Sequence, residues 1–304
     1  MSEPILQKTL PFAPWMDPRT ARLPGTLPID GDDWLRQDDA FAAQMAERDR
    51  LIERSPEVVH RTLQSARPAV AELFARVLDE VRNRDGYRVG AETVVRPDGV
   101  EVPLNGGEPM LTLGRLVQED LILMRKGEDG WRLAAGSLCF PSSWTLTEKF
   151  GRPLQEIHRP IPGFGPGTRN DELINRMFDR LHQPVLRFNW SIQAGNALYH
   201  PLSHEGRVER AETRPSRFDD AGLNASAFIR VERQTLRKLP VSGDILFTIR
   251  IYLDPLGWIA RHPNRAKVAA SFAAQLKTLN IEQLDYKGLT ADRDRLVQAL
   301  ENMG

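Results

Sequence analysis

The hydrophobic and polar positions divide the chain into a helical beginning, a strand-rich centre and a helical end. From Asp38 to Asn83 apolar residues recur every three or four positions, which predicts amphipathic helices. One of these is expected to begin with Ser55 as its N-cap, and Pro68 is expected to kink or split it. The pair Asp254–Pro255 predicts the start of further helices. The chain before Asp38 has no clear period and is expected to be an extended arm packed on the body.

The hydrophobic period changes to two in the centre of the chain, where five segments are expected to be strands. The third shows the alternation most clearly, because Leu186, Phe188 and Trp190 are separated by polar residues. This pattern is typical of a half-buried antiparallel strand. The first two strands are expected to be joined by a turn at Gly127–Gly130. The five segments are "GRLVQEDLILMRK", "GWRLAAGSLCF", "PVLRFNWSI", "SAFIRVERQTLRKLP" and "GDILFTIRIYL".

The segment 141–183, between the second and third strands, is expected to contain short helices at "SSWTLTEKF" and "PLQEIHRP" and a longer one at "NDELINRMFDRLH". Helices, then a sheet with inserted helices, then helices again is the order of an α+β protein. We therefore expect an N-terminal arm and helices over 1–83, a sheet core over 84–254 and a C-terminal helical extension over 255–304. These three parts are expected to pack as one unit.

Composition excludes several classes of protein. The 304 residues include 41 Lys and Arg against 41 Asp and Glu, which favours neither a nucleic acid nor an anionic membrane as partner. No long apolar run or leader pattern occurs, so we expect a soluble cytoplasmic protein. The single cysteine, Cys139, excludes an internal disulfide and an all-cysteine metal site. Familiar phosphate-binding loops and the GxSxG, HExxH and CxxC motifs are absent.

His158 is the histidine whose surroundings differ from those of the other five. An apolar, partly aromatic environment suits a large flat cofactor better than a hard metal ion. The alternative is a core histidine bonded to a backbone carbonyl. The apolar neighbours of His158 in the sequence are Trp144, Phe150, Leu154, Ile157, Ile161 and Phe164.

The other histidines and the cysteine have simpler interpretations. His60 is expected to be an ordinary helix residue, and His182 to end a helix as a favourable cation. His200 and His204 are four residues apart but are expected to lie in a loop, where this spacing does not make a metal site. Cys139 is either a buried small hydrophobe or a thiolate ligand of haem.

The fourth strand carries charges at positions expected to be buried. Arg233 shares a face with Ile229 and Val231, whereas Glu232 points to the other side. A charge on an apolar strand face is costly unless it is paired or binds a ligand. An internal ion pair and a polar group aimed into a pocket are both open interpretations.

Several separated segments resemble the haem-dependent oxidative N-demethylase family, which includes the oxygenase subunit of dimethylamine monooxygenase. The resemblance spans Leu10 to Asp254. It is carried by "LPFAPWMDPRTARLPG", "DWLRQDDAFAAQMAERDRLI", "LVQEDLILM", "GSLCFPSSWTLTEKFGRPLQEIHRPIPG", "LRFNWSI" and "RVERQTLRKLPVSGDILFTIR".

The resemblance implies a PAS-like domain, a five-stranded antiparallel sheet with helices inserted after its second strand, that holds haem b. His158 is then in the position of the axial iron ligand, with Cys139 and next His182 as the alternatives. Trp144 and Phe164 are expected to contact the haem.

The resemblance also implies an activity. Dioxygen would oxidise the methyl group of a small methylated amine such as dimethylamine, releasing formaldehyde. The electrons would come from NADPH through FMN and an iron–sulfur cluster on separate reductase subunits, because this chain has one cysteine and no nucleotide loop. Glu232 and Trp190 are expected to hold the amine, and Arg233 to assist oxygen activation or pair with a haem propionate. The alternatives are a haem or small-ligand PAS sensor without turnover, and a structural subunit that has lost haem.

Overall fold

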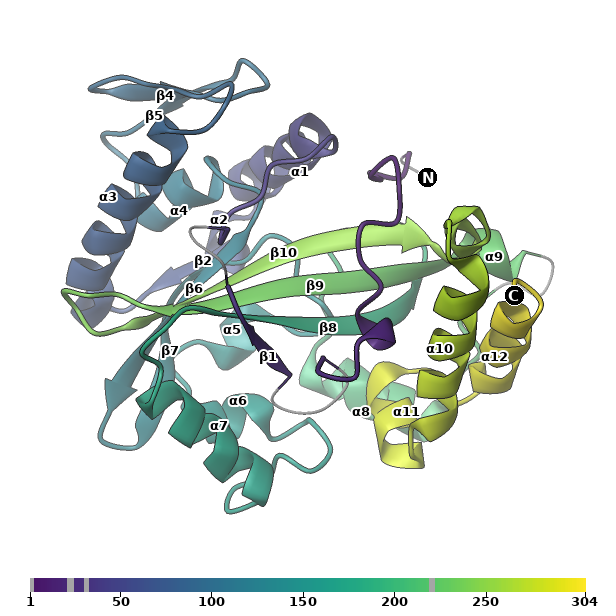
Figure 1. Cartoon of the computed structure of the whole chain (residues 1–304). Coiled ribbons are helices and arrows are strands. Elements are labelled where there is room, and N and C mark those ends of the chain that lie inside the picture. The colour runs from purple at the N-terminus through teal and green to yellow at the C-terminus, as the bar shows by residue number, and fades with distance from the viewer. Residues whose placement is uncertain (1–2, 21–24, 30–32, 219–221) are drawn as a thin grey trace.

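The computed structural model describes residues 3–20, 25–29, 33–218 and 222–304. A long antiparallel sheet runs through its middle with helices on both faces (Figure 1). Within the described residues this sheet has seven strands in the order β1-β8-β9-β10-β6-β7-β2. They are β1 (Thr26–Pro28), β2 (His60–Thr62), β6 (Asp120–Gly127), β7 (Gly130–Ser137), β8 (Val185–Ala194), β9 (Ala227–Lys238) and β10 (Ile245–Pro255).

The five strands predicted from the hydrophobic pattern are confirmed as β6 to β10, and they are neighbours in the sheet. Gly127 pairs with Gly130 at the expected turn. The sheet is wider than the five strands expected, because β1 pairs with β8 and β2 pairs with β7 at its two edges. A second sheet also has no counterpart in the prediction. Its three short strands are β3 (Arg88–Val89), β4 (Thr93–Val95) and β5 (Glu101–Pro103).

The N-terminal helical region contains α1 (Phe41–Arg54), α2 (Pro56–Val59), α3 (Arg67–Arg82) and α4 (Pro109–Gly114). Pro68 lies in the first turn of α3, so the predicted split at this proline is confirmed. Ser55 is the N-cap of α2, as predicted, and Pro56 is its first residue, although the Ser55 side chain caps no backbone N–H. The helical prediction for His60 is wrong, because α2 ends after one turn and His60 pairs with Ser137 of β7.

The expected helices between β7 and β8 are α5 (Leu146–Lys149), α6 (Leu154–His158) and α7 (Arg169–Asp179). His182 is exposed and lies beyond the end of α7, so it does not end that helix as predicted. His204 begins a helix that was predicted as loop, α8 (His204–Thr213). A short helix, α9 (Leu223–Ser226), lies directly before β9. Three helices follow β10: α10 (Arg265–Thr278), α11 (Ile281–Lys287) and α12 (Arg293–Glu301).

The two faces of the main sheet contact different parts of the chain. One face, which we call the terminal face, carries Phe188, Trp190 and Val231. It packs on the N-terminal arm, α10 and α12. Asn189 and Glu232 are opposite each other on the insert face, the other side of the sheet. Apolar residues of this insert face pack on α5, α6 and α7 (Figure 1).

The N-terminal arm lies along the sheet and α10, as expected for a packed segment (Figure 1). Its anchor is Trp15, whose ring stacks on that of Phe272 with centroids 4.0 Å apart. The indole N–H of Trp15 also donates to the carbonyl of Val268 at 3.0 Å. In the part of the chain that the structure describes, no helix is both long and apolar enough to span a membrane.

Candidate functional site

His158 is the last residue of α6, and its neighbours fix the position of its ring. Leu154 and Ile157 of the same turn are buried in the core below the insert face. The carbonyl of His158 accepts a hydrogen bond from the N–H of Ile161 at 2.8 Å. The rings of His158 and Phe164 lie 5.7 Å apart between centroids. The imidazole is therefore held half-buried beside an aromatic ring.

Burial, followed by the charges of Lys149 and Arg187, lowers the pKa of His158 to about 3. At pH 7 the imidazole is therefore neutral, and one ring nitrogen keeps a free lone pair. Within the described residues, no group forms a hydrogen bond with either ring nitrogen. A neutral imidazole with a free nitrogen is the form of histidine that binds metals.

Two cationic side chains lie close to His158. The Lys149 ammonium is 4.4 Å from the centroid of the Trp144 ring, and burial lowers the pKa of Lys149 to about 8. Burial also lowers the pKa of Arg187, whose Nε is enclosed without a hydrogen-bond partner in the described structure. The described residues supply neither cation with a carboxylate at ion-pair distance. Both cations would be stabilised by an anionic group bound beside His158.

The carboxylate of Glu232 is the nearby negative charge. Its residue is only 5% exposed and lies on the insert face. Asn189 Nδ2 donates to Oε1 at 3.3 Å, and Gln234 Nε2 donates to Oε2 at 2.5 Å. The charge of Glu232 raises the pKa values of Lys149 and Arg187, against the effect of burial. Two amides therefore orient a buried carboxylate on the same side of the sheet as His158.

Trp190 and Arg233, which were predicted to act with Glu232, lie on the opposite face of the sheet. Trp190 packs edge-on against Phe272 of α10, with centroids 5.0 Å apart. Arg233 Nη2 lies 3.0 Å from the carboxylate of Asp33 and 2.6 Å from its carbonyl oxygen. Of the two interpretations of this buried arginine, the structure shows the internal ion pair.

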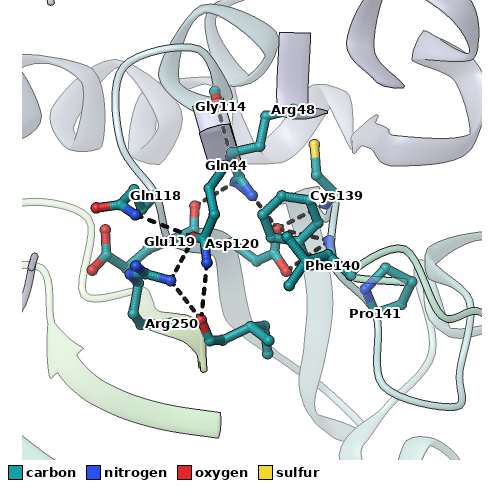
Figure 2. Close-up of polar contacts among 12 residues, drawn as sticks. Gln44, Arg48, Gly114, Gln118, Glu119, Asp120, Cys139, Phe140, Pro141 and Arg250 are labelled. Carbon is teal, nitrogen blue, oxygen red and sulfur yellow. Dashed lines mark hydrogen bonds and ion pairs between the residues drawn. The ribbon is translucent and has the colours of Figure 1, made fainter. Parts of the chain in front are cut away.

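A buried ionic network lies where the chain leaves β7 for the inserted helices (Figure 2). Arg48 of α1 contacts the carboxylate of Asp120 at 2.8 Å, and neither side chain has any exposed surface. The same carboxylate accepts hydrogen bonds from the N–H groups of Cys139 at 2.7 Å and Phe140 at 3.1 Å. The network thus fixes the turn by which the chain leaves β7 for the inserted helices.

Cys139, the alternative iron ligand, belongs to this turn. Its side chain is fully buried, and burial raises the pKa of the thiol to about 12. The thiol is therefore protonated at pH 7, whereas a metal is bound by the thiolate. This chemistry favours His158 over Cys139 as a ligand.

Arg230 holds the same turn from the sheet. It lies on the insert face and is completely buried. Its Nη2 donates to the carbonyls of Phe140, Pro141 and Leu198 at 2.8, 3.1 and 3.0 Å, and its Nη1 donates to Gln193 Oε1 at 3.0 Å. A buried arginine can satisfy several carbonyls in this way because its guanidinium presents five donors. The entry to the inserted helices is therefore fixed from both sides.

His200 gives the native state a predictable pH dependence. Burial and then Arg230 lower its pKa to about 4, whereas a histidine in an unfolded chain has a pKa of about 6.5. As pH falls from 7 towards 4, the unfolded state binds the proton first, so the native state loses stability in this window. We expect His200→Asn to reduce the loss between pH 7 and pH 5 by about 1–2 kcal/mol. Urea unfolding at pH 7 and at pH 5 measures the free energy of unfolding, and the difference between the two values is this loss.

The exposed His182 supplies the control, and His182→Asn should leave the pH dependence as it is in the wild-type protein. An equal loss of stability in the wild-type protein and His200→Asn would contradict the assignment.

The two cations of the site could not be predicted from the sequence. Lys149 and Arg187 lie on α5 and β8, far apart in the chain, and both are near His158 only because α5 and α6 pack below the insert face. For Arg187 a weak signal exists, since it is a polar position of an alternating strand, between the apolar Leu186 and Phe188. Nothing in the pattern distinguishes Lys149 from a surface lysine.

A family model described as haem-dependent oxidative N-demethylase, alpha subunit-like, matches residues 25–297 of this chain. The match covers all seven strands of the main sheet as well as His158 and Glu232. The chain therefore belongs to this family, as its sequence motifs implied.

Proposed function

We propose that this chain is the haem-binding oxygenase subunit of an oxidative N-demethylase. It removes a methyl group from a small methylated amine, with dimethylamine as the simplest candidate, and releases formaldehyde. The observation that carries the proposal is the neutral His158 imidazole, held beside an aromatic ring in a chain of this family.

The residues around His158 fit haem b in three respects. The neutral imidazole nitrogen would bind the iron. Phe164 and Trp144 would offer aromatic surface to the macrocycle. Lys149 and Arg187, which lack a carboxylate partner among the described residues, supply charges for the two propionates. Arg233 is not used here, because it is paired with Asp33 on the other face.

The topology supports a PAS-like core. β6 to β10 are contiguous and antiparallel, and α5, α6 and α7 follow the second of these strands in the chain. In this proposal β1 and β2 are edge additions to a five-stranded core, and His158 of α6 would hold the haem beside the insert face.

Haem, when bound, supplies the activation of dioxygen. In the overall reaction one oxygen atom enters a C–H bond of the methyl group and the other leaves as water, with two electrons and two protons consumed. The resulting carbinolamine breaks its C–N bond to give formaldehyde and the smaller amine. Separate subunits carrying NADPH, FMN and an iron–sulfur cluster deliver the electrons. Glu232, oriented by Asn189 and Gln234, holds the ammonium of the substrate.

Two measurements test the proposal. The purified chain titrated with haem should develop a saturable Soret band at one haem per chain. With dioxygen, a reductase and a methylated amine, it should then form one formaldehyde for each amine demethylated. Absence of the band would refute haem binding. A band without formaldehyde from any of a panel of methylamines would favour a sensor instead.

A further inference from the structure

We infer that the substrate carries a carboxylate next to its methylated amine, and that a small polar pocket beside Glu232 binds this carboxylate. The inference rests on the proposed function and names its substrate class, the N-methylated amino acids. N,N-dimethylglycine is the smallest tertiary example.

The pocket lies at the edge of the main sheet. β1 pairs with β8 only from Val185 to Arg187, so the later part of β8 has no neighbouring strand on that side in the described structure. α11 covers this edge, and Lys287 Nζ donates to the carbonyl of Trp190 at 2.7 Å. The cavity has a volume of about 40 Å³, whereas a single water needs about 10–15 Å³. Its polar lining includes Asn189, Ser191, His200, Arg217, Tyr286 and Lys287.

The charges of this lining suit an anion. Lys287 uses one of its three donors on Trp190, and its pKa, lowered by burial to about 8, leaves it charged at pH 7. Arg217 Nη1 makes only long contacts of 3.4 Å, to the carbonyls of Lys287 and Gly288. The hydroxyl of Tyr286 bonds to no described residue. No carboxylate is found among the described residues that line the pocket.

The distribution of charge around Glu232 disfavours a simple dialkylammonium ion. Lys149 and Arg187 lie towards His158, and Lys287 and Arg217 lie towards the pocket. The two haem propionates would neutralise only the first pair. A bare cation on Glu232 would therefore add to the positive charge of Lys287 and Arg217, which Trp190 and Asp292 offset only in part, whereas a zwitterion places its carboxylate beside them.

Asn189 joins the two halves of the site. Its side chain lines the pocket and also donates to Glu232 Oε1 at 3.3 Å. Asn189 thus borders the polar pocket and also contacts the amine-binding carboxylate. An α-amino acid, in which one carbon separates the amine nitrogen from the carboxylate, is the smallest molecule that offers a group to each.

Binding to the haem-loaded protein tests the inference with N,N-dimethylglycine, its neutral amide and dimethylamine. Changes in the Soret band report binding, and calorimetry reports binding to the haem-free chain. We expect N,N-dimethylglycine to bind about 10- to 100-fold more tightly than its amide, the range for hydrogen bonds to a charged group.

Two variants locate the effect. Lys287→Met keeps the apolar stem, and we expect it to erase the preference for N,N-dimethylglycine and to strengthen dimethylamine binding, because one positive charge near Glu232 is removed. Tyr286→Phe removes a hydroxyl that holds no described residue, so it should not disturb the fold. We expect this variant to bind N,N-dimethylglycine about 3- to 10-fold more weakly than the wild-type protein does. Lys267→Met, at an exposed position of α10, is the matched control and should change nothing.

Equal affinity for N,N-dimethylglycine and its amide would overturn the inference. It would also be overturned if Lys287→Met weakened haem binding but left the preference intact, because Lys287 would then hold a propionate. Failure of the chain to bind haem would instead refute the proposed function. The haem-free titration would still test the pocket, and saturable binding of N,N-dimethylglycine that is lost in Lys287→Met would uphold it.

Discussion

Replacing His158 with alanine is expected to abolish haem binding by the purified chain. The native imidazole is neutral at pH 7, so it offers a lone pair without first losing a proton. The alanine side chain has no lone pair that could bind iron. Loss of an outer hydrogen-bond partner of a metal ligand costs about 10- to 100-fold in affinity, and loss of the ligand itself should exceed that. A Soret titration with haem measures the change, and formaldehyde formation should disappear with the band.

His182→Ala is the matched control for this experiment, since His182 is an exposed histidine beyond the end of α7. It should bind haem as the wild-type chain does. Far-UV circular dichroism should show that His158→Ala is folded, because a half-buried ring at the end of a short helix contributes little to the core. A position and intensity of the Soret band unchanged by His158→Ala would refute the ligand assignment.

Replacing Arg48 with methionine is expected to destabilise the protein by about 3–5 kcal/mol, the cost of removing one partner of a buried ion pair. Asp120 would be left without its guanidinium in an interior where neither side chain has exposed surface. The carboxylate would keep only its bonds to the backbone of Cys139 and Phe140. Urea unfolding at pH 7, followed by tryptophan fluorescence, measures the free energy of unfolding.

The control is Arg50→Met on the same helix. Arg50 pairs with Glu47 at 2.7 Å, but its side chain is 50% exposed, and such a pair contributes about 0.2–1 kcal/mol. In the double variant Arg48→Met with Asp120→Asn, the buried charge is removed as well, so the loss should be smaller than the sum of the two single losses. A change below about 1 kcal/mol in Arg48→Met would contradict a buried, charged pair.

The central strands could be predicted because their signal is local. Each of β6 to β10 spans eight residues or more and carries its own alternation or apolar run. β1 and β2 have three residues each, too few for a period, and their pairing with β8 and β7 is decided by distant parts of the chain. The helical spacing of apolar residues before β2 predicted that the helix would continue through His60. The helix ends after one turn of α2 instead, because the backbone of His60 pairs with Ser137 of β7.

The candidate site could be predicted only in part, and the register explains why. His158 was identified by its apolar sequence neighbours, and Glu232 by its place in a charged strand. Trp190 was assigned to the same pocket because its strand was expected to lie beside that of Glu232. The strands are indeed adjacent, but Glu232 faces Asn189 and Trp190 faces Val231. A difference of one residue in register moves a side chain to the other side of the sheet.

The strand order also determines when this protein can be completed during synthesis. β1 emerges from the ribosome early but must wait for β8, and Trp15 must wait for α10, where its hydrogen-bond partner lies 253 residues away. Contacts of such long range form late in folding. Tyr286 and Lys287, which line the polar pocket beside Asn189, also follow every strand of the main sheet in the chain. The pocket should therefore be closed only after β8 has paired with β9.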